Sequence, residues 1–484
     1  MSLSSSDIPI KVEFISENGT LANQLANHIR GMVASGRLVP GDRLPSTRAM
    51  ASELKLARGT VSSAVELLIA EGLFETRIGA GTFVASEAAL LQEPQPAGSS
   101  DVVFNDTPTA DIDPKISCDV DFRPCRPSLD GFPVQVWRRC LSMAASSPLS
   151  PDYGDPLGDI RLRTVISAYL RRARGLVAGA GEIVITNGSV HAMHLLAHVY
   201  LSAKSKVFFE DPGYPLARQT FALSGATLEF CDVDQDGILV ETLPDQVPAS
   251  SLVYVTPSHQ FPTGGRLSLR RRHELSEWAN CHGALIVEDD YDGEYRYDVP
   301  PLAPLASFDR THVVYCGTFS KTMFPGLRLG FAVAPKPIVE AMASYRALAE
   351  YAPSAITQVA LASFISEGHY ERHIHRMRRI YRKKRRFVVD FLESNRLPAS
   401  FLGLDSGLSG ILKFDTNKPI ADLCKELQKQ KILMPPISRY WVRKPSAVNQ
   451  AVVGYAAPSL TEIERGLEFV FQTLRQIQPS AVAT

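Results

Sequence analysis

Lys321 stands in a run of residues whose chemistry suits an aldehyde and a phosphate. The apolar segment Val313–Cys316 leads into this run, which contains Thr318, Ser320, Lys321 and Arg328. A lysine amine condenses with an aldehyde to form a Schiff base, while hydroxyl groups and an arginine can hold a phosphate. Pyridoxal 5'-phosphate (PLP) carries both groups. A single Ser-Lys pair would more often be an ordinary surface pair, so the other motifs decide the interpretation.

An acidic segment precedes the lysine run. Glu288-Asp-Asp-Tyr291 follows the apolar segment Ala284–Val287. A carboxylate beside a pyridine nitrogen favours the protonated ring, which is the form that withdraws electrons. Asp289 is the candidate for this contact, and the Tyr291 hydroxyl is a candidate to bind the ring oxygen. Taken alone, such a segment is usually solvated or caps a helix.

Two further strand ends carry residues suited to the same ligand. Asp211-Pro-Gly-Tyr214 offers the Tyr214 ring for stacking on a pyridine. Asn187-Gly-Ser189 lies between a predicted strand and a predicted helix, so Gly188 and Ser189 would present backbone N–H groups to a phosphate. Either motif alone could be a plain turn. Because ligands of open α/β sheets bind beyond the carboxyl ends of strands, the motifs together favour one shared site.

The elements that position these residues are those of a mostly parallel sheet covered by helices. From about Asp119 onward, short apolar strands alternate with longer helical patterns. Residues 86–118 contain several prolines and lose apolar periodicity, which is typical of a linker. The length of 484 residues exceeds what one core usually serves, so at least two domains are expected.

The helical periodicity and the few prolines of residues 20–85 predict a compact module of three helices and two strands. The helices are expected over Leu21–Ser35, from the N-cap Ser46 to Leu54, and up to Ala70. This order is that of a winged helix-turn-helix, whose second motif helix enters the major groove of double-stranded DNA. The candidate DNA contacts are Arg43, Ser46, Thr47, Arg48, Arg58, Gly59, Thr60 and Arg77. The alternative is a helical protein-interaction module with solvated arginines.

Composition limits the other partners. The 51 Lys and Arg residues balance 51 Asp and Glu residues, so binding to nucleic acid or membrane would need a local patch. The sequence contains no recognisable signal peptide and no membrane-length apolar run, and its seven cysteines form no Cys-x-x-Cys pair. We therefore expect a cytoplasmic protein with reduced thiols, no membrane contact and no metal site.

Two resemblances connect these observations. The segments Pro40–Arg48 and Ala57–Val61 resemble the pattern of GntR-family regulators, with alanine at 57 where serine is commoner. Residues from about 119 resemble the class I/II aminotransferases, which are fold-type I PLP enzymes. Their order, together with the motifs Glu210–Tyr214 and Thr256–Gly264, is similar to that of the MocR/GabR subgroup of GntR-family regulators.

This resemblance implies an α/β fold class with three parts. They are a winged helix-turn-helix at 14–86, a linker at 87–118, and a PLP-binding aminotransferase-like domain at 119–484 with a smaller C-terminal subdomain. Lys321 would form the Schiff base with PLP, and the other cofactor contacts would be Asp289, Tyr291, Tyr214, Gly188, Ser189, Thr318, Ser320 and Arg328. Tyr153 resembles the tyrosine that each subunit of such homodimers lends to its neighbour's phosphate site.

The implied function is a PLP-dependent, DNA-binding transcriptional regulator rather than an enzyme, although residual half-transamination is compatible with it. A true aminotransferase with an accessory DNA-binding domain is the first alternative. A scaffold that has lost its cofactor is the second. The intact Lys321, Asp289 and Arg328 argue against the scaffold.

Two departures from the aminotransferase pattern bear on the effector. Phe261 stands where these enzymes often have asparagine, and Val452 where many have an arginine that clamps a substrate carboxylate. Arg218, Arg439 and Arg443 are other candidates for that role. The effector is therefore expected to be PLP itself, with control of vitamin B6 synthesis, or an amine that forms an aldimine with PLP. An amine effector would imply control of amine or amino-acid catabolism, for example of a γ-amino acid, taurine or an ectoine derivative.

The run from Arg372 to Arg386 is strongly basic at helical spacing. Such runs are usually the solvated face of a helix, here the one expected to join the large and small subdomains. The alternative is a second contact surface for the DNA backbone, which would steepen the salt dependence of binding.

Overall fold

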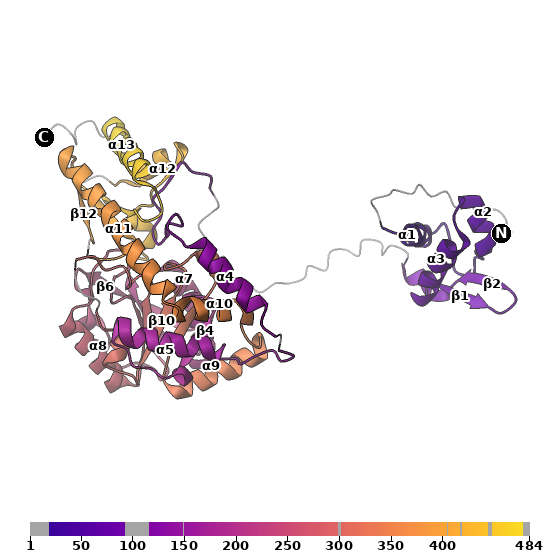
Figure 1. The fold of residues 1–484 in the computed structure, drawn as a ribbon, viewed down its shortest axis with the longest axis horizontal. Helices are drawn as coiled ribbons and strands as arrows, with labels where there is room; N and C mark the ends of the chain where they lie inside the picture. Colours follow the sequence, from indigo (N-terminus) through magenta and orange to yellow (C-terminus); the bar gives the residue numbers. More distant parts are fainter. Residues whose placement is uncertain are drawn as a thin grey trace. The chain divides into compact units, whose positions relative to one another are not determined.

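The computed structural model describes residues 19–91, 116–148, 150–298, 302–403, 405–416, 419–443 and 448–477. The chain divides into two compact units, residues 1–107 and 108–484, which Figure 1 draws in sequence colours. Each unit has its own core. The boundary expected at residue 14 and most of the expected linker lie outside the described residues.

Three helices and a two-stranded wing build the N-terminal unit. The elements are α1 (Leu21–Ala34), α2 (Thr47–Leu54), α3 (Arg58–Ala70), β1 (Phe74–Arg77) and β2 (Gly81–Val84). The two strands pair antiparallel. Ser46 caps α2, since its hydroxyl accepts a hydrogen bond from the Ala49 backbone N–H at 3.1 Å. Apolar side chains three or four positions apart, such as Leu25 and Ile29, fill the core between the helices.

The described structure of this unit continues past residue 86, where the sequence places the end of the domain. A short 3-10 helix, η1 (Ser86–Leu91), follows the wing. Ala88 of η1 is 1% exposed and belongs to the core of the unit. The fold therefore reaches Leu91, because the small side chain of Ala88 packs into the core and holds η1 against the helices.

An eight-stranded sheet lies at the centre of the second unit, in the order β4-β11-β10-β9-β8-β5-β6-β7. The strands are β4 (Ile183–Thr186), β5 (Lys206–Asp211), β6 (Thr227–Asp234), β7 (Gly237–Ile238), β8 (Leu252–Val255), β9 (Leu285–Asp290), β10 (Val313–Thr318) and β11 (Gly330–Val333). The neighbours from β10 to β6 pair in parallel. β11 is antiparallel to β10 and β4, and β7 is antiparallel to β6.

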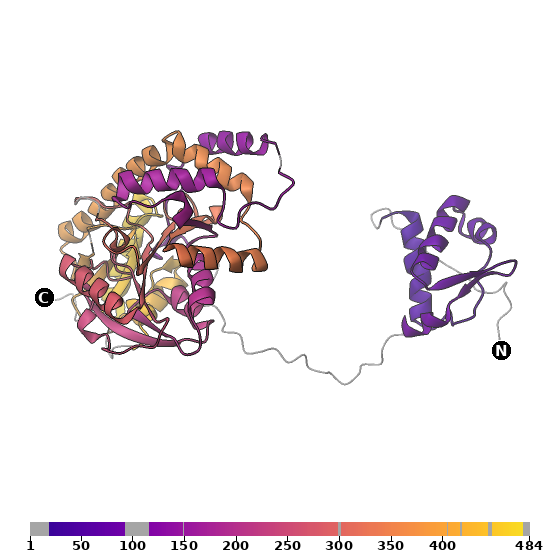
Figure 2. The same cartoon turned by 90° about the horizontal axis from the view of Figure 1, so that it is seen from below.

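Helices cover both faces of the sheet, because successive side chains of a strand point to opposite sides. In β10, Tyr315 packs with one layer of helices, whereas Val314 and Cys316 pack with the other. The first layer is α4 (Val134–Ala145), α5 (Ile160–Arg174), α8 (Leu269–His282) and α10 (Ala355–Ser366). The second layer is α6 (Ser189–Tyr200), α7 (Pro215–Ala222) and α9 (Lys336–Ala349). Figure 2 shows the same unit from below.

A smaller C-terminal part follows the long helix α11 (His369–Ser394). Its three-stranded antiparallel sheet has the order β12-β13-β15, and a second core packs around it. The elements are β12 (Ala399–Leu402), β13 (Ser409–Phe414), α12 (Ala421–Lys429), β14 (Ile432–Leu433), β15 (Gln450–Gly454) and α13 (Leu460–Ile477). β3 (Val120–Asp121) pairs in parallel with β14, so the first strand of the unit is tied to this part.

Short 3-10 helices complete the second unit: η2 (Ala180–Glu182), η3 (Val240–Thr242), η4 (Leu305–Ser307), η5 (Pro325–Leu327) and η6 (Ile437–Tyr440). The α/β fold class predicted from the sequence, with a winged helix-turn-helix, a mostly parallel sheet and a smaller C-terminal subdomain, is confirmed. Among the described helices, none has the length and apolar content needed to cross a bilayer.

Candidate functional site

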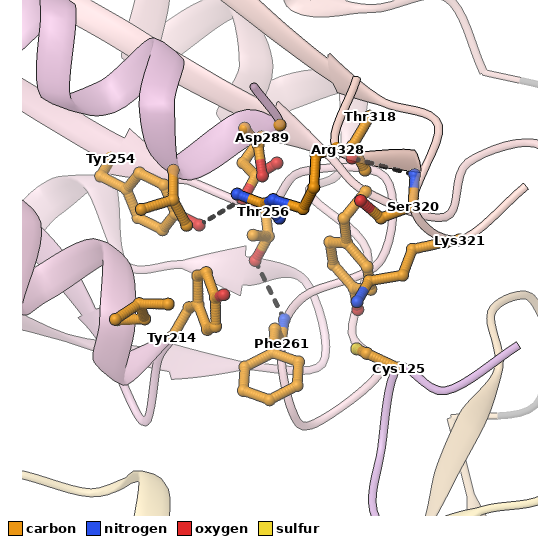
Figure 3. A pocket seen from close by; sticks show the side chains of 15 residues that line it. Cys125, Tyr214, Tyr254, Thr256, Phe261, Asp289, Thr318, Ser320, Lys321 and Arg328 are labelled. Atoms are coloured by element: carbon orange, nitrogen blue, oxygen red, sulfur yellow. Dashed lines mark hydrogen bonds between the residues drawn. The ribbon is translucent and has the colours of Figure 1, made fainter. Parts of the chain in front are cut away.

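The carboxyl ends of β4, β5, β8, β9 and β10 border one pocket of about 190 Å³. Every residue predicted to bind the cofactor lines this pocket except Tyr153; these are Gly188, Ser189, Tyr214, Asp289, Tyr291, Thr318, Ser320, Lys321 and Arg328. Figure 3 shows most of these side chains around a common space. The structure therefore brings residues from five strand ends together.

Asp289 lies in the wall of the pocket and is 3% exposed. Its Oδ2 accepts a hydrogen bond from the Tyr254 hydroxyl at 2.7 Å (Figure 3). Its Oδ1 is buried and has no hydrogen-bond partner among the described residues. Burial raises the pKa of Asp289 to about 7, although the Tyr254 hydrogen bond and the Lys321 charge act in the opposite direction. A cationic N–H donor at Oδ1 would offset this cost.

The three consecutive carboxylates of β9 have three different environments. Glu288 accepts hydrogen bonds from the backbone N–H groups of Leu305 and Ala306, at 3.0 and 3.1 Å. Asp290 forms a buried ion pair with Arg174. Of the three, only Asp289 lines the pocket. The alternation of the strand explains why the middle residue alone faces the ligand space.

The end of the pocket near α6 suits an anion. Gly188 has a φ of +95° and precedes α6, whose N-terminus has no side-chain cap. The Arg328 guanidinium lies beside this turn, and its Nη2 donates to the Asn187 carbonyl oxygen at 2.6 Å. Ser320 and Thr318 add hydroxyl groups from the end of β10. Free N–H groups, hydroxyls and a guanidinium are the donors that bind a phosphate.

Lys321 and Cys125 line the side of the pocket that faces Tyr214 and Phe261 (Figure 3). Burial raises the pKa of the Cys125 thiol to about 12, while the positive charge of Lys321 opposes that rise. Cys125 comes from the segment after β3, and the sequence interpretation did not include it. The thiol is therefore a neutral neighbour of the lysine at ordinary pH.

An aromatic and aliphatic wall faces the cofactor residues. Phe261 is 6% exposed, and its ring meets those of Tyr214 and Tyr440 edge-on, with centroid distances of 5.8 and 5.1 Å. Val452 is fully buried in the same cluster. Tyr291 belongs to this cluster too, and its hydroxyl donates to the His259 carbonyl oxygen at 3.0 Å. The position where the aminotransferase pattern has an arginine is thus part of an apolar cluster.

The alternative arginines do not line this wall. Of the described residues around the pocket, only Lys321 and Arg328 carry a positive charge. Arg443 is paired with Asp211 at 3.3 Å and Asp232 at 2.6 Å. Arg218 and Arg439 lie outside the lining, and each has interactions of its own. Among the described lining residues, a carboxylate-bearing ligand therefore finds no cation besides Lys321 and Arg328.

Tyr153 lies outside the pocket of its own chain. Its side chain is 78% exposed and stacks on Tyr351 with a centroid distance of 4.5 Å. Tyr351 follows α9 and is also exposed, at 57%. The stacked pair forms an apolar projection on the surface of the second unit.

Sequence reasoning missed several pocket residues, namely Cys125, Val190, Leu216, Tyr254 and Thr256. Tyr254 had a detectable signal, because a tyrosine inside a short aliphatic strand needs a partner for its hydroxyl. Thr256 had none, since its role depends on long-range contacts: it donates to Glu210 at 2.6 Å and accepts from the Phe261 backbone N–H at 2.9 Å.

In the N-terminal unit, the predicted DNA contacts lie on α2, α3, the wing and the loop before α2. Arg48 and Arg58 are exposed in the first turns of α2 and α3. Ala57 precedes α3 without a side-chain cap, so the first N–H groups of that helix lack a side-chain acceptor. The remaining candidates are exposed or half-buried; they are Arg43, Ser46, Thr47, Gly59, Thr60 and Arg77. The Arg77 guanidinium lies over the Phe83 ring, 4.7 Å from its centroid.

Two family models match this chain in separate regions. Residues 127–468 match the model described as aminotransferase class I and II. Residues 21–84 match the model of bacterial regulatory proteins of the gntR family. The matches correspond to the second and first structural units.

Similar proteins combine both regions. The chain is 31% identical to the probable rhizopine catabolism regulatory protein MocR of Rhizobium meliloti, over 92% of each chain. It is 32% identical to the pyridoxine biosynthesis transcriptional regulator PdxR of Corynebacterium glutamicum, over 90% of this chain and 92% of that one. It is also 32% identical to the transcriptional regulator TauR of Rhodobacter capsulatus, over 97% and 100%.

Solved structures share the fold of the second unit. An archaeal alanine:glyoxylate aminotransferase is 25% identical, with a TM-score of 0.69 over 75% of this chain and 92% of that one. The kynurenine aminotransferase of Pyrococcus horikoshii is 23% identical, with a TM-score of 0.68 over the same shares.

Proposed function

Since the chain belongs to the MocR/GabR type of GntR-family transcriptional regulators, we propose that it binds operator DNA through its winged helix-turn-helix and senses PLP, or an amine reacting with PLP, in the pocket around Lys321. The single observation that carries the ligand assignment is that Lys321 and Asp289 line the same pocket. The buried Oδ1 of Asp289 without a partner matches a protonated ring nitrogen.

The residues of the pocket fit PLP group by group. Lys321 would attach it covalently, Asp289 would hold the ring nitrogen, and Tyr291 the ring oxygen. Tyr214 would cover the ring face. The anion end would bind the phosphate through Gly188, Ser189, Thr318, Ser320 and Arg328. When bound, PLP supplies an aldehyde that reacts reversibly with amines and a ring that withdraws electrons.

The pocket favours PLP itself, or an amine without a carboxylate, over the γ-amino acid that the sequence also allowed as an effector. The aromatic ring of Phe261 lines the wall that faces the lysine, and the buried Val452 packs in the same apolar cluster. Lys321 and Arg328 would both be used by the cofactor, so no other cation among the described lining residues would remain to clamp an acid group. The similarity to a regulator of pyridoxine biosynthesis favours PLP and control of vitamin B6 synthesis. The similarity to MocR, which is named as a probable regulator of rhizopine catabolism, favours the amine and control of a catabolic pathway.

The second unit is used for sensing rather than for turnover. Transamination of an amino acid needs the substrate carboxylate held while protons move at the cofactor, because misplacement of the reacting atoms costs rate steeply. The apolar cluster around Val452 provides no such clamp. A residual first half-reaction with a tightly bound amine is compatible with this arrangement.

DNA recognition is assigned to the exposed face of α2, α3 and the wing. Arg43, Arg48, Arg58 and Arg77 would contact phosphates or guanines, with hydroxyl groups from Ser46, Thr47 and Thr60. The uncapped start of α3 at Gly59 would offer backbone N–H groups to a phosphate. The exposed arginines in the first turns of α2 and α3, Arg48 and Arg58, support the assignment of this face to DNA.

The active form is a homodimer of the aminotransferase-like unit. The stacked pair of Tyr153 and Tyr351 and the neighbouring Leu348, which is 90% exposed, form an apolar surface that a second subunit would cover. Tyr153 of the partner subunit would then complete the phosphate site. Two DNA-binding units in one dimer would favour paired half-sites.

Absorbance spectroscopy and DNA binding together test the proposal. The purified protein, loaded with PLP, should show a visible band that borohydride abolishes, and peptide mass analysis should place the modification on Lys321. A random duplex library should yield a defined operator. Steady turnover of amino acids with 2-oxoglutarate, together with DNA binding that ignores PLP and amines, would favour the enzyme instead.

A further inference from the structure

The outward face of α11 carries a row of basic side chains whose charge is mostly left unneutralised by the fold and lies outside the pocket. We define the outer stripe as Arg372, Arg376, Arg379, Lys383 and Arg386, all exposed. At 100° per residue these positions fall within about 80° of one another around the helix. They span about 21 Å along its axis. In Figure 1 α11 runs along the second unit from the C-terminal part toward the large sheet.

The inward basic residues of α11 already have structural roles. Arg378 donates to the Glu294 carbonyl oxygen at 2.7 Å, and Lys384 to that of Ala456, also at 2.7 Å. Arg385 is paired with Asp298 and lies over the Tyr297 ring, 4.9 Å from its centroid. These contacts tie the helix to the loop after β9 and to the C-terminal part. The basic character needed for folding is therefore accounted for without the outer stripe.

The outer stripe keeps most of its charge available. Arg379 and Lys383 make no hydrogen bond or ion pair with any described residue. Arg372 and Arg376 donate only to carbonyl oxygens or a histidine, which leaves their charge unneutralised. Arg386 is 3.8 Å from the exposed Asp390, a weak pair at the end of the row.

No acidic residue interrupts the chain between Arg372 and Arg386. The acidic residue just before the stripe, Glu371, is paired with Arg172 of α5 at 2.6 Å. The whole chain has a formal net charge of zero, so this row is a local excess and not a consequence of a basic protein. A row of flexible cationic side chains on a rigid helix suits a linear polyanion.

We propose that the outer stripe of α11 binds the phosphate backbone of operator DNA, as a second, sequence-independent contact surface. A 21 Å length of duplex presents roughly six phosphates on each strand. The stripe has no base-reading geometry, so it adds affinity and salt dependence but no sequence discrimination. The chain already contains a DNA-binding unit, which makes duplex DNA the polyanion that the stripe meets at high local concentration.

The test compares two triple substitutions with equal loss of charge. The first is Arg379→Gln with Lys383→Gln and Arg386→Gln. The matched control is Arg270→Gln with Lys336→Gln and Lys425→Gln, on α8, α9 and α12, whose side chains are 74%, 79% and 71% exposed. Fluorescence anisotropy on the operator, repeated over a range of KCl concentrations, gives the slope of log affinity against log salt.

In the stripe variant, the slope of log affinity against log salt should become shallower by roughly 0.9 for each lost phosphate contact. At low salt this variant should bind the operator more weakly than the wild type does. Its preference for operator over scrambled DNA should stay that of the wild type. The control variant should keep the wild-type slope. A charge-conserving variant, Arg379→Lys with Lys383→Arg and Arg386→Lys, should also keep it, which separates charge from folding. Equal slopes for the stripe variant and the wild type, or equal losses in both triple variants, would overturn the proposal.

Discussion

At the scale of single residues, the two oxygens of Asp289 serve different purposes. The Tyr254 hydroxyl donates to Oδ2 at 2.7 Å, while Oδ1 is buried and has no hydrogen-bond partner among the described residues. A buried carboxylate in this state is costly, which is why burial raises its pKa to about 7. The Tyr254 hydrogen bond is the protein's own means of favouring the charged form. Cofactor binding should therefore depend on Tyr254 although this tyrosine need not contact the cofactor.

Replacing Tyr254 with phenylalanine should weaken PLP binding at neutral pH by about two- to tenfold, the value of one hydrogen bond. Loss of the donor raises the pKa of Asp289 further above about 7. The protonated carboxyl cannot pair with a pyridinium. As the pH is lowered, the affinity for PLP should therefore begin to fall at a higher pH in the variant than in the wild type. Raising the pH should restore it. A fluorescence titration with PLP from mildly acidic to alkaline pH measures this shift.

Tyr315→Phe is the matched control for that titration. Its hydroxyl is also buried and donates to a carboxylate at 2.7 Å, but that carboxylate is Asp290, which lies outside the pocket lining. The control should leave the pH profile of PLP binding where it is in the wild type. Indistinguishable profiles for the two variants would contradict the role given to Tyr254.

The sequence was sufficient to predict that certain residues at strand ends would lie together in one pocket. Lys321, Asp289 and Gly188 follow apolar segments, and the parallel sheet carries such ends to one edge. Tyr254 and Cys125 could not be found this way. Tyr254 reaches Asp289 only because β8 and β9 are neighbours, an order that the spacing along the chain does not encode. Cys125 reaches Lys321 because β3 pairs with β14, far along the chain.

At the scale of elements, helix boundaries in the N-terminal unit could be predicted closely, because caps and glycines mark them. The Ser46 side chain caps the N-terminus of α2, and α1 ends at Ala34, shortly before Gly36. η1 could not be predicted, since its short run of small and apolar residues has neither a cap nor a full helical repeat. What holds η1 in place is the burial of Ala88 in a core that the rest of the unit forms.

Arg48 and Arg58 begin the two motif helices, and each alanine substitution should weaken operator binding by about 1–3 kcal/mol if the contact is bidentate to a base. The physical reason is loss of charge-assisted hydrogen bonds in a groove from which water is largely displaced. Electrophoretic mobility shift with the selected operator measures the effect. Arg30→Ala is the control, since Arg30 belongs to the same unit but pairs with Glu71 at 2.6 Å. Unchanged affinity for both motif variants would remove them from the interface.

At the scale of the whole molecule, the exposed Tyr153 predicts that one subunit completes the cofactor site of the other. Tyr153→Ala and Lys321→Ala should each bind PLP poorly as separate proteins. Mixed after unfolding and refolding together, they should regain one complete site in each mixed dimer, with wild-type lysine and tyrosine. Sedimentation should show the dimer, and the visible band should return only in the mixture.

If mixing restores no band while the mixed dimer forms, Tyr153 does not act across the interface. A PLP-loaded monomer at micromolar concentration would contradict the dimer itself. The fold alone could not decide this point, because the tyrosine lies outside the pocket of its own chain. The 78% exposure of the Tyr153 side chain is the feature from which we infer that a second subunit covers it.

The central claim is that operator binding responds to the ligand held at Lys321. Its most direct test is the affinity and footprint on the selected operator, measured for the wild type and Lys321→Ala over a range of PLP concentrations, with and without a panel of carboxylate-free amines. The account predicts that PLP or one such amine changes the wild-type footprint, while Lys321→Ala binds DNA with a fixed footprint. An identical ligand response in both proteins would contradict it.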